Sequence, residues 1–229
     1  MSYPLLLIRF GALLIAGEVD SGSMLILVSK PIPRLGIFSA KFLAYIIYGL
    51  LLSLIPLVVI TATTVVLHPL GGVLPFFCLN FVYSLFLLFF FGISIVSLSA
   101  IVRKPRNALV FPIFLIVFLN FVMLFFKPFL LRKPLDNDST IYGDYLIYYF
   151  DLSYHLANIF KGLAEPLILG IRTNIGPILQ VYGVYRMDIG EIPIVDTNYL
   201  NPLTSFIILT IFALGLLVIG LLRFILREI

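Results

Sequence analysis

The sequence predicts an all-α membrane protein: a polytopic helix bundle of four full spans, with a short N-terminal hydrophobic segment and an outer amphipathic helical region. Of the 229 residues, 62% are hydrophobic and 11% are charged, whereas soluble domains have about 25% charged residues. Mean hydropathy is +1.16. Four apolar runs reach the roughly 20 residues that a helix needs to cross a bilayer. The chain therefore lacks the polar side chains needed to cover a soluble globule.

The N-terminal part begins with a short apolar segment, residues 3–16, which Arg9 interrupts. A charged, proline-containing segment follows at 17–36, and the first full span is predicted at 37–67. Pro56 lies inside this span, where its missing backbone N–H predicts a kink.

Three further spans are predicted at 73–102, 108–126 and 203–222. A short basic corner with Arg103, Lys104 and Arg106 separates the first two of them. Small residues gather in the span at 73–102 and favour close helix packing, with a substrate path or a dimer seam as the alternative. These residues are Gly92, Ser94, Ser97, Ser99 and Ala100.

The long segment 128–202 has a pattern of its own. From Tyr142 to Leu163, apolar and aromatic residues recur every three or four positions, which predicts a tyrosine-rich amphipathic helix at the outer interface or packed on the spans. Residues 188–202 are predicted to form a loop. One face of the helix is expected to be solvated, with a metal site or proton relay as the alternative; its polar residues are Asp144, Asp151 and His155.

Orientation follows from the Lys and Arg residues of the short loops, which concentrate on the cytoplasmic side. This rule assigns 17–41, 103–107 and 223–229 to the cytoplasm, and the turn 68–72, which has no Lys or Arg, to the outside. Four spans return the chain to the side where it started, so 128–202 is predicted to be extracytoplasmic. The basic residues Lys127, Arg132 and Lys133 oppose this assignment, but the rule does not govern so long a loop.

Several classes of function lack their motifs. No Gly-rich loop ending in Gly-Lys-Ser/Thr is present to bind ATP phosphates, and no catalytic motif or metal-ligand spacing occurs. Cys78 is the only cysteine, so no internal disulfide can form. The basic residues lie between apolar runs and not in a stripe, so no nucleic-acid partner is indicated. The central parts of the spans lack Asp, Glu, Lys and Arg, which disfavours an ion-coupled transporter or channel.

The charged segment after residue 16 has an ordered pattern: Glu18, Gly22-Ser23, Leu25-Ile26-Leu27, Ser29-Lys30-Pro31, Arg34 and Lys41. This order resembles the cytoplasmic signature of ABC-2-type transporter permeases. Ser23 stands where that family usually has Thr, and Pro33 where it has a small polar residue. The match covers about a tenth of the chain.

The resemblance implies the membrane subunit of an ATP-driven exporter in a cell membrane, typically prokaryotic. ATP and Mg would bind to a separate ABC ATPase subunit, and this chain would hold no cofactor. A second permease subunit would complete a homo- or heterodimer within the membrane lipid, with the substrate path between the two halves. The implied ATPase-coupling contact comprises Glu18, Gly22, Met24, Leu25, Leu27, Pro31, Pro33 and Arg34.

The local chemistry of this segment suits a rigid contact surface. Pro31 and Pro33 fix their own φ angles and restrict the preceding residues, while Gly22 would allow close backbone approach. Glu18 and Arg34 are expected to pair with the partner or with each other. A solvated loop with snorkelling lysines is the alternative. The corner Arg103, Lys104 and Arg106 would bind lipid headgroups or form a second partner contact.

Two questions stay open at this point. A structural or anchoring subunit of another complex is the alternative function. The family pattern also has six spans preceded by an elbow helix, and here the elbow and first span have no counterpart. A chain that starts later than the natural product, a natural short variant and a cleaved signal peptide are the three explanations.

Overall fold

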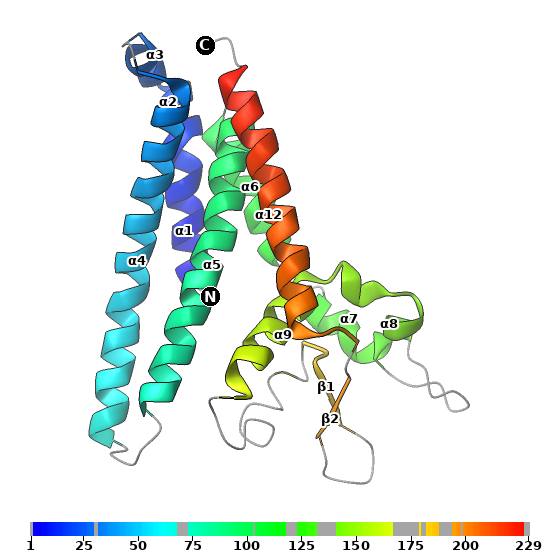
Figure 1. Ribbon diagram of the computed structural model, residues 1–229. Helices are drawn as coiled ribbons and strands as arrows, with labels where there is room; N and C mark the ends of the chain where they lie inside the picture. Colours follow the sequence, from blue (N-terminus) through cyan, green and yellow to red (C-terminus); the bar gives the residue numbers. More distant parts are fainter. Residues whose placement is uncertain are drawn as a thin grey trace. The chain divides into compact units, whose positions relative to one another are not determined.

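The computed structural model of the protein is predominantly helical, as the sequence predicts (Figure 1). It describes residues 2–29, 32–67, 73–102, 104–117, 123–131, 141–166, 179, 182–187, 194–197 and 199–226. The chain divides into two compact units, the first formed by 1–114 with 210–229 and the second by 115–209.

The first unit begins with a helical rod that has an unusual turn in it. Helix α1 (Ser2–Ala12) runs into a π-helical turn, η1 (Leu13–Gly17), and then into α2 (Glu18–Asp20). The predicted short segment 3–16 is therefore helical throughout. The other helices that contribute to this unit are α3 (Ser23–Val28), α4 (Arg34–Leu67), α5 (Val73–Ile101), α6 (Pro105–Val117) and α12 (Pro202–Ile225).

Three helices in the described part of the chain are long and apolar enough to cross a membrane. They cover Arg34–Thr63, Phe77–Ile101 and Pro202–Ile225, and they correspond to the predicted spans at 37–67, 73–102 and 203–222. Helix α4 continues through Pro56. The remaining predicted span, 108–126, contains most of α6 and the start of α7 (Met123–Leu130), and its residues 118–122 lie outside the described part.

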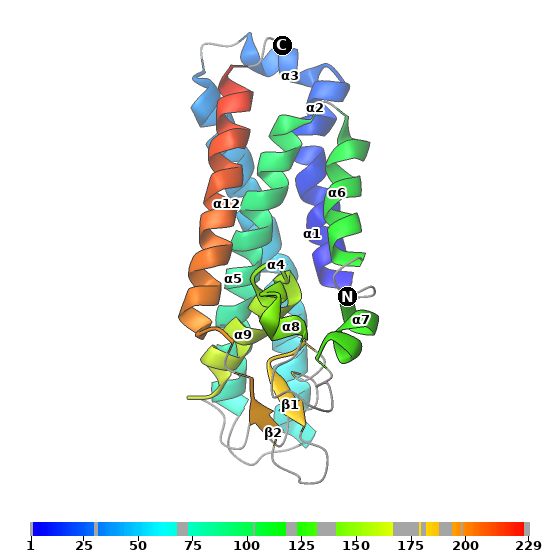
Figure 2. The same cartoon turned by 90° about the vertical axis from the view of Figure 1, so that its right-hand side faces the viewer.

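Small residues determine how closely the helices of the first unit pack. An added Cβ at Gly92 of α5 would lie 2.5 Å from the ring of Tyr45 on α4. One at Gly220 of α12 would lie 2.8 Å from the backbone of Ser97 on α5. Ala12 and Ala16 pack with Ala108, so α6 lies beside the N-terminal rod (Figure 2). This agrees with the predicted role of the small residues in close packing.

The second unit combines short helices with one two-stranded antiparallel ladder. Its elements are α7, α8 (Ile141–Asp144), η3 (Ile147–Tyr149), α9 (Leu152–Ala164), β1 (Tyr185–Met187) and β2 (Ile194–Asp196). Tyr185 pairs with Asp196 across the ladder. The prediction of a loop at 188–202 missed β2. Tyrosine rings fill the core, which includes Tyr142, Tyr148, Tyr154 and Tyr185.

The predicted amphipathic helix is only partly correct. Helix α9 matches its C-terminal half, but the chain leaves the α-helix between Asp144 and Leu152. Leu146 has a φ of 53°, in the left-handed region that non-glycine residues seldom adopt. Asp151 then starts α9 afresh as an N-cap, since its carboxylate accepts hydrogen bonds from the backbone N–H groups of Ser153 and Tyr154. Hydrophobic spacing alone does not reveal such a break.

Candidate functional site

The segment between α2 and α4 turns sharply at Gly22. This glycine has a φ of +75°, and an added Cβ would meet nothing within 4 Å. Gly22 thus has a backbone conformation that side chains disfavour, and its close approach to a partner stays a prediction. The hydroxyls of Ser21 and Ser23 both donate to the Glu18 carbonyl, at 3.2 and 3.3 Å, and these bonds close the turn.

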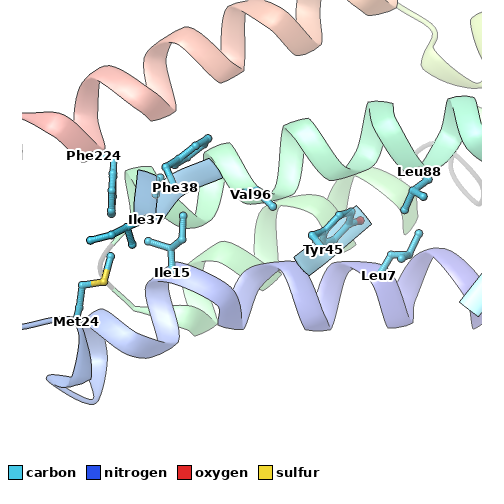
Figure 3. Close-up of a cluster of buried hydrophobic side chains, with 10 residues drawn as sticks. Leu7, Ile15, Met24, Ile37, Phe38, Tyr45, Leu88, Val96 and Phe224 are labelled. Atoms are coloured by element: carbon cyan, nitrogen blue, oxygen red, sulfur yellow. The ribbon is translucent and has the colours of Figure 1, made fainter. Parts of the chain in front are cut away.

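Met24 anchors α3 to the bundle. Its side chain is 0% exposed and belongs to the same core cluster as Ile15, Ile37, Phe38 and Phe224 (Figure 3). The assignment of Met24 to the implied ATPase-coupling contact therefore requires correction, because the protein's own helices enclose its side chain. The side chains of Leu25 and Leu27, and Pro31 as a whole, lie outside the described part.

Glu18 forms an ion pair with Lys41, which connects α2 to the first turns of α4. The two side chains are 27% and 22% exposed respectively, so water screens the pair only in part. The second carboxylate oxygen of Glu18, Oε2, is buried and accepts no hydrogen bond from the described residues. Glu18 therefore pairs with Lys41. The predicted alternative, a pair between Glu18 and Arg34, does not form.

Arg34 connects the beginning of α4 to the end of α12. Its Nη1 donates to the carbonyl oxygen of Ile225 at 2.9 Å. A guanidinium is well placed there, because the last carbonyls of a helix lack intrahelical partners and carry partial negative charge.

Beyond these anchors, the segment presents a surface that we call the exposed tip, formed by Ile26, Ser29, Ile32, Pro33 and Leu35. The three large apolar side chains in it are 67%, 46% and 55% exposed, in chain order. The segment thus combines a base fixed to three helices with an apolar, proline-containing end that nothing in the described chain covers.

Comparison with protein families identifies the family of this chain. A family model for ABC-2 family transporter proteins matches residues 1–228. The chain belongs to the ABC-2 transporter family. Comparisons with curated proteins and with solved structures gave no match. The resemblance carried by residues 18–41 is thereby confirmed, by a match over nearly the whole length of the ABC-2 chain.

The second basic corner of the ABC-2 chain is partly visible. Lys104 and Arg106 are exposed, and Arg103 lies outside the described residues. The Lys104 carbonyl accepts from the N–H of Asn107 at 3.1 Å, which initiates α6. The corner thus directs two cationic side chains to its surroundings. Headgroup binding and a second partner contact both remain predictions.

A buried ion pair in the second unit of the ABC-2 chain escaped the sequence analysis. Lys127 Nζ lies 2.6 Å from Asp151 Oδ2 and donates to the hydroxyl of Ser153 at 2.9 Å and to the Tyr182 carbonyl at 2.8 Å. The Tyr142 hydroxyl donates to the same carboxylate at 2.7 Å. The charge of Lys127, which opposed the predicted orientation, is therefore neutralised inside the protein.

The prediction of a solvated face is wrong for Asp151 and His155, which are 1% and 2% exposed; Asp144 alone is exposed. Burial by itself would raise the pKa of the Asp151 carboxyl, but the Lys127 ammonium and the hydrogen bonds from Ser153 and Tyr142 hold that pKa below its ordinary value. The sequence offered one indication of this ion pair, a lysine at the edge of an apolar run. It did not indicate that Asp151 is the partner of that lysine.

Burial also lowers the pKa of His155, which keeps the imidazole neutral. Its Nε2 lies 3.0 Å from the Tyr149 carbonyl, which can only accept, so Nε2 carries the proton. Nδ1 then accepts from the Ser205 hydroxyl at 3.1 Å. Within the described residues no group of three His, Cys, Asp or Glu side chains is arranged to hold a metal.

Proposed function

We propose that the chain is the membrane-spanning permease subunit of an ATP-driven ABC-2-type exporter in a cell membrane. Membership of the ABC-2 family and the three long apolar helices support this proposal. ATP and Mg bind to a separate ABC ATPase subunit, and the permease transmits the motion of that subunit. A second permease subunit, identical or different, completes the translocation path within the lipid.

The observation that carries the proposal is the way residues 18–35 are anchored. A lever transmits force only if its base moves together with the load. Here the base is the Glu18–Lys41 pair, the buried Met24 and the bond from Arg34 to α12. The exposed tip offers apolar contacts to the ATPase. ATP binding then shifts the population between inward- and outward-facing states through this connection.

The first experiment tests whether the permease has an ATPase partner. The affinity-tagged chain is expressed in its source cells, purified together with the proteins that bind it and reconstituted into proteoliposomes. We expect the two proteins to co-purify and to show flux that requires hydrolysable ATP. Failure to recover any nucleotide-binding protein would contradict the proposal in favour of an anchoring role. Flux that persists after ATP depletion would contradict it in favour of a secondary transporter or channel.

A second experiment tests whether the ATPase contact lies on the exposed tip. Ile26→Ser removes the most exposed apolar side chain of the tip and is expected to reduce ATPase recovery several-fold. Leu203→Ser is the matched control, since Leu203 is similarly exposed, at 65%, but lies at the start of α12, outside the segment. Equal loss in both variants, or in neither, would place the contact elsewhere.

A further inference from the structure

The π turn Leu13–Gly17 immediately precedes the segment assigned to ATPase coupling. A π turn contains one residue more than the α-helical path requires, and such turns are rare and frequent at functional sites. After the turn, each place on the helix is therefore occupied by the residue that follows, in sequence, the one that a continuous α-helix would put there. One residue corresponds to a rotation of about 100° and a rise of about 1.5 Å. This turn therefore sets the direction in which Glu18 and the following segment face.

One side chain from another helix keeps the turn open. In a regular α-helix the N–H of Ala16 would donate to the carbonyl of Ala12. Here the hydroxyl of Ser99 on α5 lies between them: it accepts from Ala16 N at 2.9 Å and donates to Ala12 O at 3.0 Å. The same oxygen is 3.3 Å from Ile15 N. Insertion of a side chain into the hydrogen-bond ladder is a known cause of local helix distortion.

The neighbouring serines of α5 behave differently. Ser94 and Ser97 donate to the carbonyls of Phe90 and Ile93 in their own helix. Among the described contacts of these three serines, those of Ser99 reach the N-terminal rod, although all three side chains are buried. Its role is therefore not shared by small buried residues in general.

Removing the Ser99 hydroxyl takes away the acceptor of the buried Ala16 N–H. Ala12 and Ala16 are 0% exposed, so bulk water does not reach this site, and the Ala16 N–H regains a partner within its own helix if it donates to the Ala12 carbonyl, as in an α-helix. Helix α1 cannot rotate to accommodate this change, since an added Cβ at Gly11 would already lie 2.6 Å from Ile95 of α5. We therefore expect the rotation in the part that follows the turn, where it would have to displace the Glu18–Lys41 pair.

We infer that Ser99 is a positioning residue: by holding the π turn open, it sets the rotational register of the coupling segment relative to α4. Without it, each residue after the turn takes the place that its successor occupies now. Gly17 would then face Lys41 in place of Glu18, and Val19 would occupy the exposed place of Asp20. The register itself follows from these contacts, while its importance for ATP-driven transport rests on the proposed function.

The test measures the register directly. In a Cys78→Ala background, Val19→Cys and Asp20→Cys are labelled separately with a polar maleimide in the detergent-solubilised protein. Asp20 is exposed and Val19 is half-buried, so the Asp20→Cys thiol is expected to react several-fold faster. Adding Ser99→Ala is expected to raise the Val19→Cys rate to that of Asp20→Cys. Ser97→Ala is the matched control and leaves both rates unchanged.

Deleting the exposed Leu13 supplies a rescue that loss of packing would not give. The deletion removes the extra residue, so a continuous α-helix then presents Val19 in its original place. Ser99→Ala with Leu13 deleted is expected to restore slow labelling of Val19→Cys. Unchanged labelling in Ser99→Ala, or no restoration by the deletion, would overturn the inference.

A parallel assay separates this inference from the proposed function. In proteoliposomes with the ATPase, Ser99→Ala is expected to consume several-fold more ATP per substrate transported than Ser97→Ala. If the labelling shifts but no ATPase binds, the register assignment is correct and the proposed function is wrong. If the ATPase binds and drives transport while the labelling does not shift, the reverse holds.

Discussion

At the scale of single residues, the most consequential feature of the second unit is the buried ion pair of Lys127 and Asp151. Each partner neutralises a charge that would otherwise be stranded away from water. Burying such a pair gives little net stability, but removing one partner is costly because the other charge stays behind. The effect of the ion pair on stability can therefore be measured only when Lys127 and Asp151 are changed one at a time.

Asp151→Asn is expected to destabilise the protein by about 3–5 kcal/mol, since Lys127 then stays buried without its counter-charge. Asparagine is itself a good N-cap, so the start of α9 is preserved and the charge effect is isolated. Thermal unfolding followed by circular dichroism measures the loss. The exposed Asp144→Asn is the control, and adding Lys127→Met to Asp151→Asn should recover part of the stability. An effect of Asp151→Asn no larger than that of the control would refute a charged pair.

His155 predicts a pH dependence of stability. Its folded-state pKa lies below the ordinary value of 6.5, so the unfolded chain binds the proton first. The contribution of His155 to stability is therefore fully present above the ordinary pKa of 6.5. It declines as the pH falls below that value, by up to about 1.4 kcal/mol per pH unit. The contribution of Asp151 is lost only below its ordinary pKa of 3.8. Unfolding midpoints between pH 7.5 and 5 should decline in the wild type and in His68→Gln but stay nearly level in His155→Gln.

At the scale of elements, helix contacts in the first unit depend on residues without bulky side chains. Gly220→Ala would place a Cβ 2.8 Å from the backbone of Ser97, which cannot move aside as a flexible side chain would. We expect a loss of about 1–3 kcal/mol. Gly215→Ala lies on the same helix with nothing within 4 Å, and it should be neutral or slightly stabilising. Chemical denaturation of both variants in detergent compares them, and equal effects would exclude a close contact between α12 and α5.

The connection between α2 and α4 makes a different prediction. Glu18→Lys should abolish ATP-driven transport without preventing membrane insertion, because two like charges would then face each other across the former ion pair. Exchanging the partners, with Glu18→Lys and Lys41→Glu together, should restore transport if the pair serves within the protein. If the exchange restores nothing, Glu18 acts on the ATPase surface instead.

The elements also show what sequence patterns can and cannot predict. The long apolar runs correctly predicted α4, α5 and α12, because a helix that spans a membrane can be identified from the length and composition of its sequence alone. Spacing located α9 but extended it past a cap, because Asp151 reads as a polar residue of a helical face until its hydrogen bonds are known. Met24 was assigned to a partner for a similar reason: an apolar residue in a charged segment reveals neither what covers it nor from which helices.

At the scale of the whole molecule, the family was predictable because the order and spacing of the residues in 18–41 resemble its cytoplasmic signature, and the family match confirmed it. The Ser99 contact was not predictable from the sequence. It joins residues 83 to 87 positions apart, and a serine within an apolar helix usually bonds to its own backbone, as Ser94 and Ser97 do.

Membrane orientation is the prediction that concerns the entire chain. In a Cys78→Ala background, the exposed positions Ser29 and Asp144 are replaced one at a time by cysteine and treated with an impermeant maleimide. Asp144→Cys should react in intact cells, whereas Ser29→Cys should react only after permeabilisation. Reaction of Ser29→Cys from outside would reverse the predicted topology and remove any cytoplasmic ATPase from its reach.

The bond from Arg34 to Ile225 has a consequence for genetics. Its acceptor is a main-chain carbonyl, so changing the side chain at position 225 leaves the acceptor atom in place. Second-site suppressors of Arg34 variants should therefore alter the length or pitch of the last helix, and substitutions at 225 alone should be silent.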